Sequence, residues 1–142
     1  MKPPCMIVVQ YILPALRGAI AKELIEEYEL RKTEVADRME VTPAAVTQYL
    51  NRTRGDAASS VIERSSRAIS LVSEIASDLA EGQTPSDMLL MKMCRACYAL
   101  RTEGLMCELH REAMPSLKKV ESCACSLGLV AWDQFPYRAQ TD

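Results

Sequence analysis

Cysteines crowd the second half of this chain. Of the six in the sequence, five follow the spacing C-x2-C-x9-C-x15-C-x-C and are Cys94, Cys97, Cys107, Cys123 and Cys125. Iron–sulfur clusters and structural zinc ions are both held by sets of four such side chains as thiolates. The spacing therefore predicts a metal or cluster site, and all five cysteines are candidate ligands.

The spacing leaves the identity of the metal open. An iron–sulfur cluster, [4Fe-4S] in first place, is favoured because clusters tolerate irregular ligand spacings. Zinc is the alternative, because Cys94, Cys97, Cys107 and His110 form C-x2-C-x9-C-x2-H by themselves. Without a metal, the cysteines would pack as small apolar side chains, or Cys94 and Cys97 would act as a redox switch. Cys5 is isolated in the sequence and is expected to be structural.

These residues do not predict an enzyme. Cys107 and His110 have the types of a nucleophile and its base, but no third orienting group or oxyanion-binding element is visible near them. The sequence shows no glycine-rich phosphate loop, no paired catalytic acids and no carboxylate metal motif. A redox enzyme using Cys94 and Cys97 ranks third, behind the two binding functions given below.

Helices are expected to position the cysteines. A helix is predicted over 85–103, because the Thr84-Pro85 pair supplies an N-cap and a first-turn proline and Gly104 stops it. Cys94 and Cys97, three residues apart, then project from one face of that helix.

The rest of the chain is also predicted to be helical. Asp56 can cap a long helix over 57–81 that ends at Gly82, and its many serine and alanine side chains suit either a dimer seam or internal packing. Further helices are predicted over 15–28 and 115–121, followed by an irregular tail over 132–142. The apolar run 6–13 fits a buried strand or a helix that runs into Pro14, and the helix is favoured because nothing later in the chain supplies a sheet for a strand to join.

Two short helices joined by a tight turn are predicted over 32–50. The apolar period breaks at Glu40 and restarts at Thr42-Pro43, which supply the N-cap and first-turn proline of the second helix. The apolar faces of the two helices are expected to meet through Val35, Ala36, Met39, Val46 and Leu50. Ala44, Thr47 and Gln48 then point outward, and short uncharged or amide side chains suit base edges in a major groove.

The arrangement V-A-x-x-M-x-V-T-P-A-A-V-T-Q-Y-L resembles the helix-turn-helix of the phage-repressor and Xre class of DNA-binding domains over about Ala15–Gly55. The resemblance implies a recognition helix from Pro43 to Asn51. The residues that it assigns to DNA are Ala44, Thr47 and Gln48 at the bases, Thr42 at the groove wall, and Lys32, Asn51, Arg52 and Arg54 at the phosphates. In place of the usual turn glycine stands Glu40, for which a left-handed backbone costs roughly 1–2 kcal/mol. The MKPPC start and the cysteine-rich tail also look like archaeal Xre-type regulators, which implies regulation.

The charge distribution predicts that one copy of the chain binds DNA only weakly. The net charge is −2, but 31–55 carries five basic against three acidic residues, whereas the chain from 56 onward carries nine against twelve. Because so small a basic surplus gives little affinity for a polyanion, a homodimer is expected. With 49% apolar and only 5% aromatic residues, the core should be aliphatic.

An all-α protein is expected, with a helix-turn-helix domain at 1–55, a connecting or dimerisation helix at 56–83 and a cysteine-rich sensor module at 84–142. The predicted function is a transcriptional regulator that binds a two-fold symmetric DNA operator and senses redox state through its cluster. The alternative is a zinc-stabilised regulator or a helical protein–protein adaptor without redox sensing. The location should be cytoplasmic and away from membranes, because the apolar run 6–13 is too short to span a bilayer.

Overall fold

The computed structural model describes residues 1–52, 57–121, 123 and 126, and within them every regular element is helical. This confirms the all-α prediction. In chain order the elements are α1 (Pro4–Ile7), the π-helical turn η1 (Val8–Ile12), α2 (Leu13–Glu26), α3 (Lys32–Arg38), α4 (Pro43–Arg52), α5 (Ala57–Glu63), α6 (Ser66–Glu81), α7 (Ser86–Thr102), α8 (Cys107–Ala113) and the 3₁₀ turn η2 (Pro115–Lys119).

The first helix runs through Pro14 without ending there. A proline inside an α-helix lacks the N–H donor, and its ring clashes with the carbonyl four residues earlier. The wide turn η1, in which the Leu13 N–H bonds to the Val8 carbonyl, directly precedes Pro14 and relieves this clash. The helical prediction for 6–13 is therefore right, but the expected end at Pro14 is wrong.

The resulting helix, Pro4–Glu26, has 23 residues and a mean hydropathy of 1.5 over its most apolar stretch, so its length and composition would suffice to cross a membrane. This helix is thus longer than the apolar run 6–13, which by itself is too short to span a bilayer. In this fold the same helix supplies much of the core, and Ile12, Leu16, Ile20 and Leu24 are at most 2% exposed.

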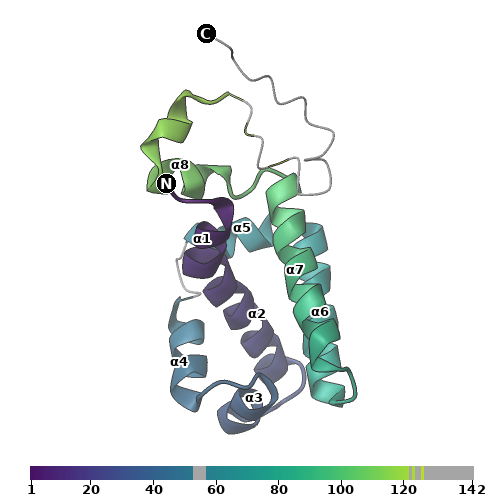
Figure 1. Ribbon diagram of the computed structural model, residues 1–142. Helices are drawn as coiled ribbons and strands as arrows, with labels where there is room; N and C mark the ends of the chain where they lie inside the picture. The colour runs from purple at the N-terminus through teal and green to yellow at the C-terminus, as the bar shows by residue number, and fades with distance from the viewer. Residues whose placement is uncertain (53–56, 122, 124–125, 127–142) are drawn as a thin grey trace.

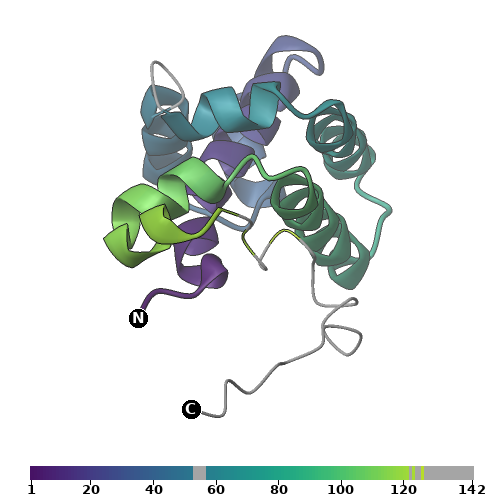
Figure 2. The same cartoon turned by 90° about the horizontal axis from the view of Figure 1, so that it is seen from above.

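The α2 helix lies at the centre of the molecule. On one side it packs against α4, and on another it packs against α6 (Figure 1). The α6 and α7 helices run side by side, as the view from above shows (Figure 2). One continuous hydrophobic cluster extends from Ile7 to Met106, so the helices that carry the cysteines share a core with the α3–α4 pair.

The long helix expected over 57–81 is two helices, which corrects that prediction. The α5 helix ends at Glu63, and α6 starts after Ser65, whose side chain is 1% exposed and accepts a hydrogen bond from the Ala68 N–H at 3.1 Å. A serine that caps a helix in this way favours a new helix start over continuation, because it satisfies an otherwise orphaned N–H. The predicted cap Asp56 lies outside the described residues.

We expect the Ser65→Ala substitution to lower the free energy of unfolding by about 1–2 kcal/mol, because it leaves the buried Ala68 N–H without its partner. Chemical denaturation followed by circular dichroism measures the loss. The neighbouring exposed serine provides the control: Ser66→Ala should change the stability by no more than about 0.5 kcal/mol. Equal effects at the two positions would show that Ser65 does not hold the break.

Two glycine stops are confirmed near the cysteine-rich half. Gly82 follows α6 with φ +71°, and Gly104 follows α7 with φ +73°, both in the left-handed region that glycine adopts at helix ends. The α7 helix starts at Ser86, with Pro85 and not Thr84 as the N-cap residue. The helix predicted over 115–121 is only the 3₁₀ turn η2, and the α-helix of this region is α8. The predicted tail over 132–142 lies outside the described residues.

Candidate nucleic-acid interface and cysteine cluster

The start of α3 is stabilised by Glu34. Its carboxylate accepts a hydrogen bond from the Arg31 backbone N–H at 2.8 Å and lies 3.5 Å from Arg31 Nε. That backbone hydrogen bond, reinforced by the positive charges of Arg31 and Arg38, lowers the pKa of Glu34 below its usual value. Lys32, the predicted phosphate contact, is exposed at the first position of the helix.

In the turn after α3, Glu40 adopts the left-handed backbone for which the sequence predicts a strain cost. This residue has φ +53°, its N–H bonds to the Asp37 carbonyl at 3.2 Å, and the Val41 N–H bonds to the Ala36 carbonyl at 2.9 Å. This pair of hydrogen bonds is the Schellman motif, in which glycine usually occupies the left-handed position. The strain expected at Glu40 is therefore present in the fold.

We expect Glu40→Gly to raise the free energy of unfolding by about 0.5–1 kcal/mol, because glycine removes the left-handed strain although it also gains freedom in the unfolded chain. Thermal and denaturant unfolding measure the gain. Glu40→Gln removes the charge but keeps the strain, so it should not stabilise. Glu29, with φ +54°, is a second left-handed position, and Glu29→Gly should stabilise by a similar amount. A gain from glutamine at position 40 would assign the effect to charge.

The start of α4 is capped as predicted. Thr42 Oγ1 accepts a hydrogen bond from the Ala45 N–H at 3.1 Å, and Pro43 occupies the first helical position. Thr47 is half-buried, and its hydroxyl donates to the Pro43 carbonyl at 3.2 Å. The residues Thr42, Pro43, Ala44, Gln48, Asn51 and Arg52 are exposed, whereas Val46 is fully buried.

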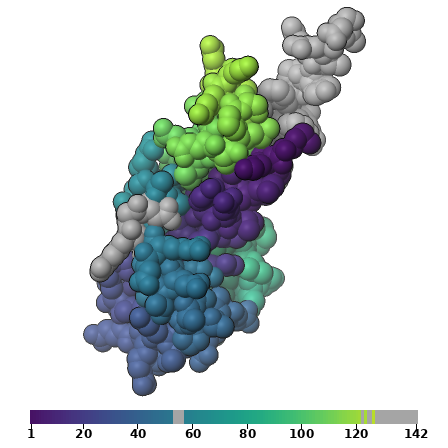
Figure 3. All heavy atoms as spheres, turned by 90° about the vertical axis from the view of Figure 1, so that its left-hand side faces the viewer, coloured from purple at the N-terminus to yellow at the C-terminus, as the bar shows by residue number. Residues whose placement is uncertain are grey.

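The predicted base-facing side chains therefore lie on the outer surface of α4, with Thr47 the most covered of them. Figure 3 shows α3 and α4 together on the face turned to the viewer. The inner face of α4 packs on α2 through Val46 and Leu50. Arg54, the last predicted phosphate contact, lies outside the described residues.

Arg17 is a positioning residue that the sequence did not reveal. Its Nη1 donates to the Tyr49 hydroxyl at 3.4 Å, and its guanidinium lies 5.8 Å from the centre of the Tyr49 ring. A cation over an aromatic face adds a modest attraction. Arg17 on α2 thus holds Tyr49 on α4. Its only sequence signal was a single charge within an apolar stretch, which does not identify a partner.

Arg38 is engaged away from the α4 surface. Its Nη1 donates to the carbonyls of Leu79 and Ala80 at 2.6 and 2.8 Å, at the C-terminal end of α6 where cations are favourable. A Cβ at Gly82 would come within 3.3 Å of the same Nη1 atom, so the glycine also leaves room for the guanidinium. Arg38 belongs to the basic surplus of 31–55, but in the fold it joins α3 to α6.

The described cysteine thiols do not form a ready-made metal site. Among the described residues, no group of three His, Cys, Asp or Glu side chains is arranged to hold one ion. Cys94 is exposed, while Cys97, Cys107 and Cys123 are partly buried. Cys125 lies outside the described residues, so its part in the predicted ligand set is not described.

Cys5 is not isolated in the fold. Burial raises the pKa of the Cys97 thiol above its usual value, the Arg101 charge opposes this rise, and the neighbouring Cys5 and Cys94 add to it electrostatically. Cys5 on α1 therefore lies within electrostatic range of the α7 thiols. The sequence interval between Cys5 and Cys97 gave no signal of this proximity.

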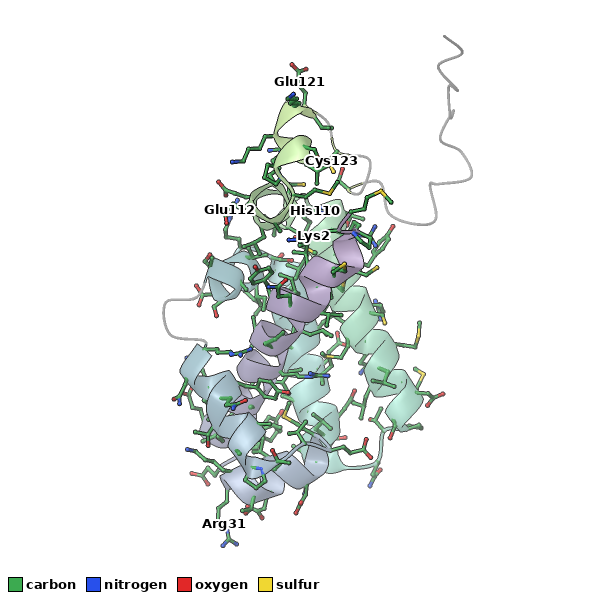
Figure 4. The ribbon with its side chains drawn as sticks, turned by 60° about the vertical axis from the view of Figure 1, so that its left-hand side comes forward. Lys2, Arg31, His110, Glu112, Glu121 and Cys123 are labelled. Carbon is green, nitrogen blue, oxygen red and sulfur yellow. The ribbon has the colours of Figure 1, made fainter. Side chains whose placement is uncertain are left out.

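His110 has a structural partner at the N-terminus of the chain. Its side chain is 6% exposed, and its Nε2 lies 2.7 Å from the Lys2 carbonyl oxygen, which can only accept. Nε2 therefore carries the proton, and Nδ1 is the nitrogen left for any metal ligation in the zinc alternative. Figure 4 places His110 and Lys2 together near Cys123, at the opposite end of the molecule from Arg31.

Comparisons of the chain with protein-family models, with curated proteins and with solved structures find no match.

Proposed function

We propose that the protein is a DNA-binding transcriptional regulator in which α4 enters the major groove. The exposure of Gln48 on the outer face of a capped helix, with Val46 buried behind it, supports this proposal most directly. A glutamine amide can bond to adenine in a bidentate manner, and the Ala44 and Thr47 methyl groups suit thymine methyls. No enzymatic activity is part of the proposal.

The phosphate contacts would come from the two ends of the α3–α4 pair. Lys32 is exposed at the start of α3, and Asn51 and Arg52 are exposed at the end of α4, with Arg54 following. The engagement of Arg38 on α6 reduces the basic surplus near DNA further. Two copies on a two-fold symmetric operator are therefore needed for useful affinity.

The salt dependence of binding to generic duplex DNA tests the proposal. With Lys32, Arg52 and Arg54 on phosphates, the logarithm of the binding constant should fall with the logarithm of salt concentration with a slope of roughly −3 per monomer. Fluorescence anisotropy between about 50 and 200 mM salt measures it. A chain that shows no salt-dependent binding would instead favour the helical adaptor, in which the α3–α4 pair contacts another protein.

For the cysteine-rich half we propose a sensor role, with Cys94, Cys97, Cys107, Cys123 and Cys125 as the supply of thiolates. A donor set of this kind suits an iron–sulfur cluster first and zinc second. Among the described residues no three candidate ligands are gathered at one point, and the proposed DNA contacts of α4 do not require the metal. The helix Pro4–Glu26 nevertheless supplies a continuous connection from the thiol-bearing end, where Cys5 lies, toward α3.

Metal analysis and the ultraviolet–visible spectrum of protein purified without oxygen test the sensor proposal. Bound iron with broad visible absorption identifies a cluster, and colourless protein with bound zinc identifies the zinc alternative. If the protein contains neither metal, the cysteines would instead serve in packing or in thiol redox chemistry. That result would leave the DNA-binding proposal intact.

A further inference from the structure

Apolar side chains follow the outer face of α7 without a partner. Met88 and Met91 are 51% and 58% exposed, Tyr98 is 39% exposed, and Cys94 is also exposed. These positions recur every three or four residues, so they form one stripe along the helix. Leu90, 66% exposed, widens it on one flank. Contiguous exposed apolar residues of this kind mark interaction surfaces on soluble proteins.

Two opposite charges border this α7 stripe symmetrically. Asp87 stands four residues before Met91 and Arg95 four residues after it, and both side chains are exposed. Neither takes part in an ion pair with another described residue. Of the other charges on α7, Lys92 binds Asp78 and Glu74 on α6, and Arg101 is half-buried in the last turn, beyond Tyr98. The stripe therefore carries no net charge of its own, but it has a direction.

We propose that the α7 stripe is the interface with a second copy of this chain, paired antiparallel with Met91 at the two-fold axis. In that arrangement Asp87 lies at the level of the partner's Arg95, and Arg95 at the level of the partner's Asp87. Met88, Met91 and Tyr98 are buried between them. In a parallel pair, Asp87 would instead lie beside the partner's Asp87 and Arg95 beside the partner's Arg95, and these like charges would repel.

The charge pattern favours a second copy over other occupants. An anionic membrane surface or DNA would require a cationic stripe, and the pattern here is neutral and complementary to itself when reversed. The stripe and α4 also lie on different sides of the molecule, with α2 between them (Figure 1). Pairing through α7 therefore leaves α4 uncovered in both copies, so this inference supplies the dimer contact that the proposed regulator requires.

Sedimentation of the full chain without DNA tests the interface. Because two such short stripes form an interface at the small end of the known range, the measurement should cover about 1–100 µM protein. We expect a dimer that Met91→Asp weakens by at least about tenfold, since two carboxylates then meet at the axis. Ile69→Asp, at a 46% exposed apolar residue of α6, is the matched control and should leave the dimer intact.

Charge reversal tests the antiparallel direction. Asp87→Arg and Arg95→Asp should each weaken the dimer several-fold, because each places like charges opposite one another across the axis. The double variant should restore the dimer, because positions 87 and 95 of the two copies then carry opposite charges again. Unchanged helical content by circular dichroism shows that the variants fold. Two weakened single variants without rescue in the double variant would overturn the antiparallel register.

Other outcomes identify other occupants. A monomeric chain that becomes a dimer when 127–142 is deleted would show that this segment covers the stripe, and it would contradict the proposal. A chain that remains monomeric in both forms would also contradict it. Since no DNA is present in these measurements, their failure is separate from a failure of the salt-dependence experiment.

Discussion

Replacing Gln48 by alanine is expected to relax the preference for one base pair in the binding site by about 1–3 kcal/mol, or roughly 5- to 150-fold in relative affinity. Gln48 is exposed on α4, and truncating it removes no contact from the core. The loss should therefore appear in DNA selection and not in folding. Selection of bound sequences from a random duplex pool, followed by titration with single-base variants, measures it.

The control for this experiment is Lys32→Ala. A lost phosphate contact should weaken binding to all sequences by a similar factor and reduce the magnitude of the salt slope by about one, without changing the preferred sequence. If Gln48→Ala leaves the base preference unchanged, α4 does not read DNA as proposed. If Gln48→Ala also destabilises the fold, the Gln48 side chain is not exposed on α4 as described.

An aspartate introduced at two positions of α4 should give opposite results. Val46 is fully buried against α2, so Val46→Asp places an unpaired charge in the core and should cost about 3–5 kcal/mol, enough to unfold much of a marginally stable chain. Ala44, two residues earlier, is exposed in the first turn of the same helix. Ala44→Asp should keep the fold, since an acid is favourable near a helix N-terminus.

Ala44→Asp should nevertheless abolish DNA binding, because it places a carboxylate where the groove of a polyanion is proposed to lie. Circular dichroism and denaturant unfolding measure the stability of both variants, and fluorescence anisotropy with duplex DNA measures the binding of Ala44→Asp. A folded Ala44→Asp variant that binds DNA as well as the original chain would move the interface away from α4. A stable Val46→Asp variant would contradict the packing of α4 on α2.

The cysteine-rich half illustrates how far spacing alone can carry a prediction. The sequence correctly predicted a helix that carries Cys94 and Cys97 and ends before Gly104. It did not bring Cys5 near Cys97, and it did not show that His110 binds the Lys2 carbonyl. The first pair interacts electrostatically and the second through a hydrogen bond. Both pairs join segments that are far apart in the chain, and residue spacing contains no information about them. The metal itself remains a prediction.

Local signals determined where several of the helices begin and end. The Thr42 cap and the glycine stops at Gly82 and Gly104 follow from hydrogen bonds and steric limits within a few residues, so the sequence was sufficient for them. At Glu40 the sequence predicted only the cost of a left-handed backbone, and the structure showed that the residue adopts it. The all-α class follows from the same signals. The helix-turn-helix assignment of α3 and α4 remains a proposal.

Only the tertiary structure decided which faces of these helices are covered. An apolar stripe with a helical period looks alike in the sequence whether it is buried, as on α2, or exposed, as on α7, because the period depends on the helix and not on its neighbours. The same holds for Arg38, whose charge suggested DNA until its contacts with Leu79 and Ala80 assigned it to α6. Burial and long-range hydrogen bonds arise from packing between distant segments, which the linear order of residues does not specify.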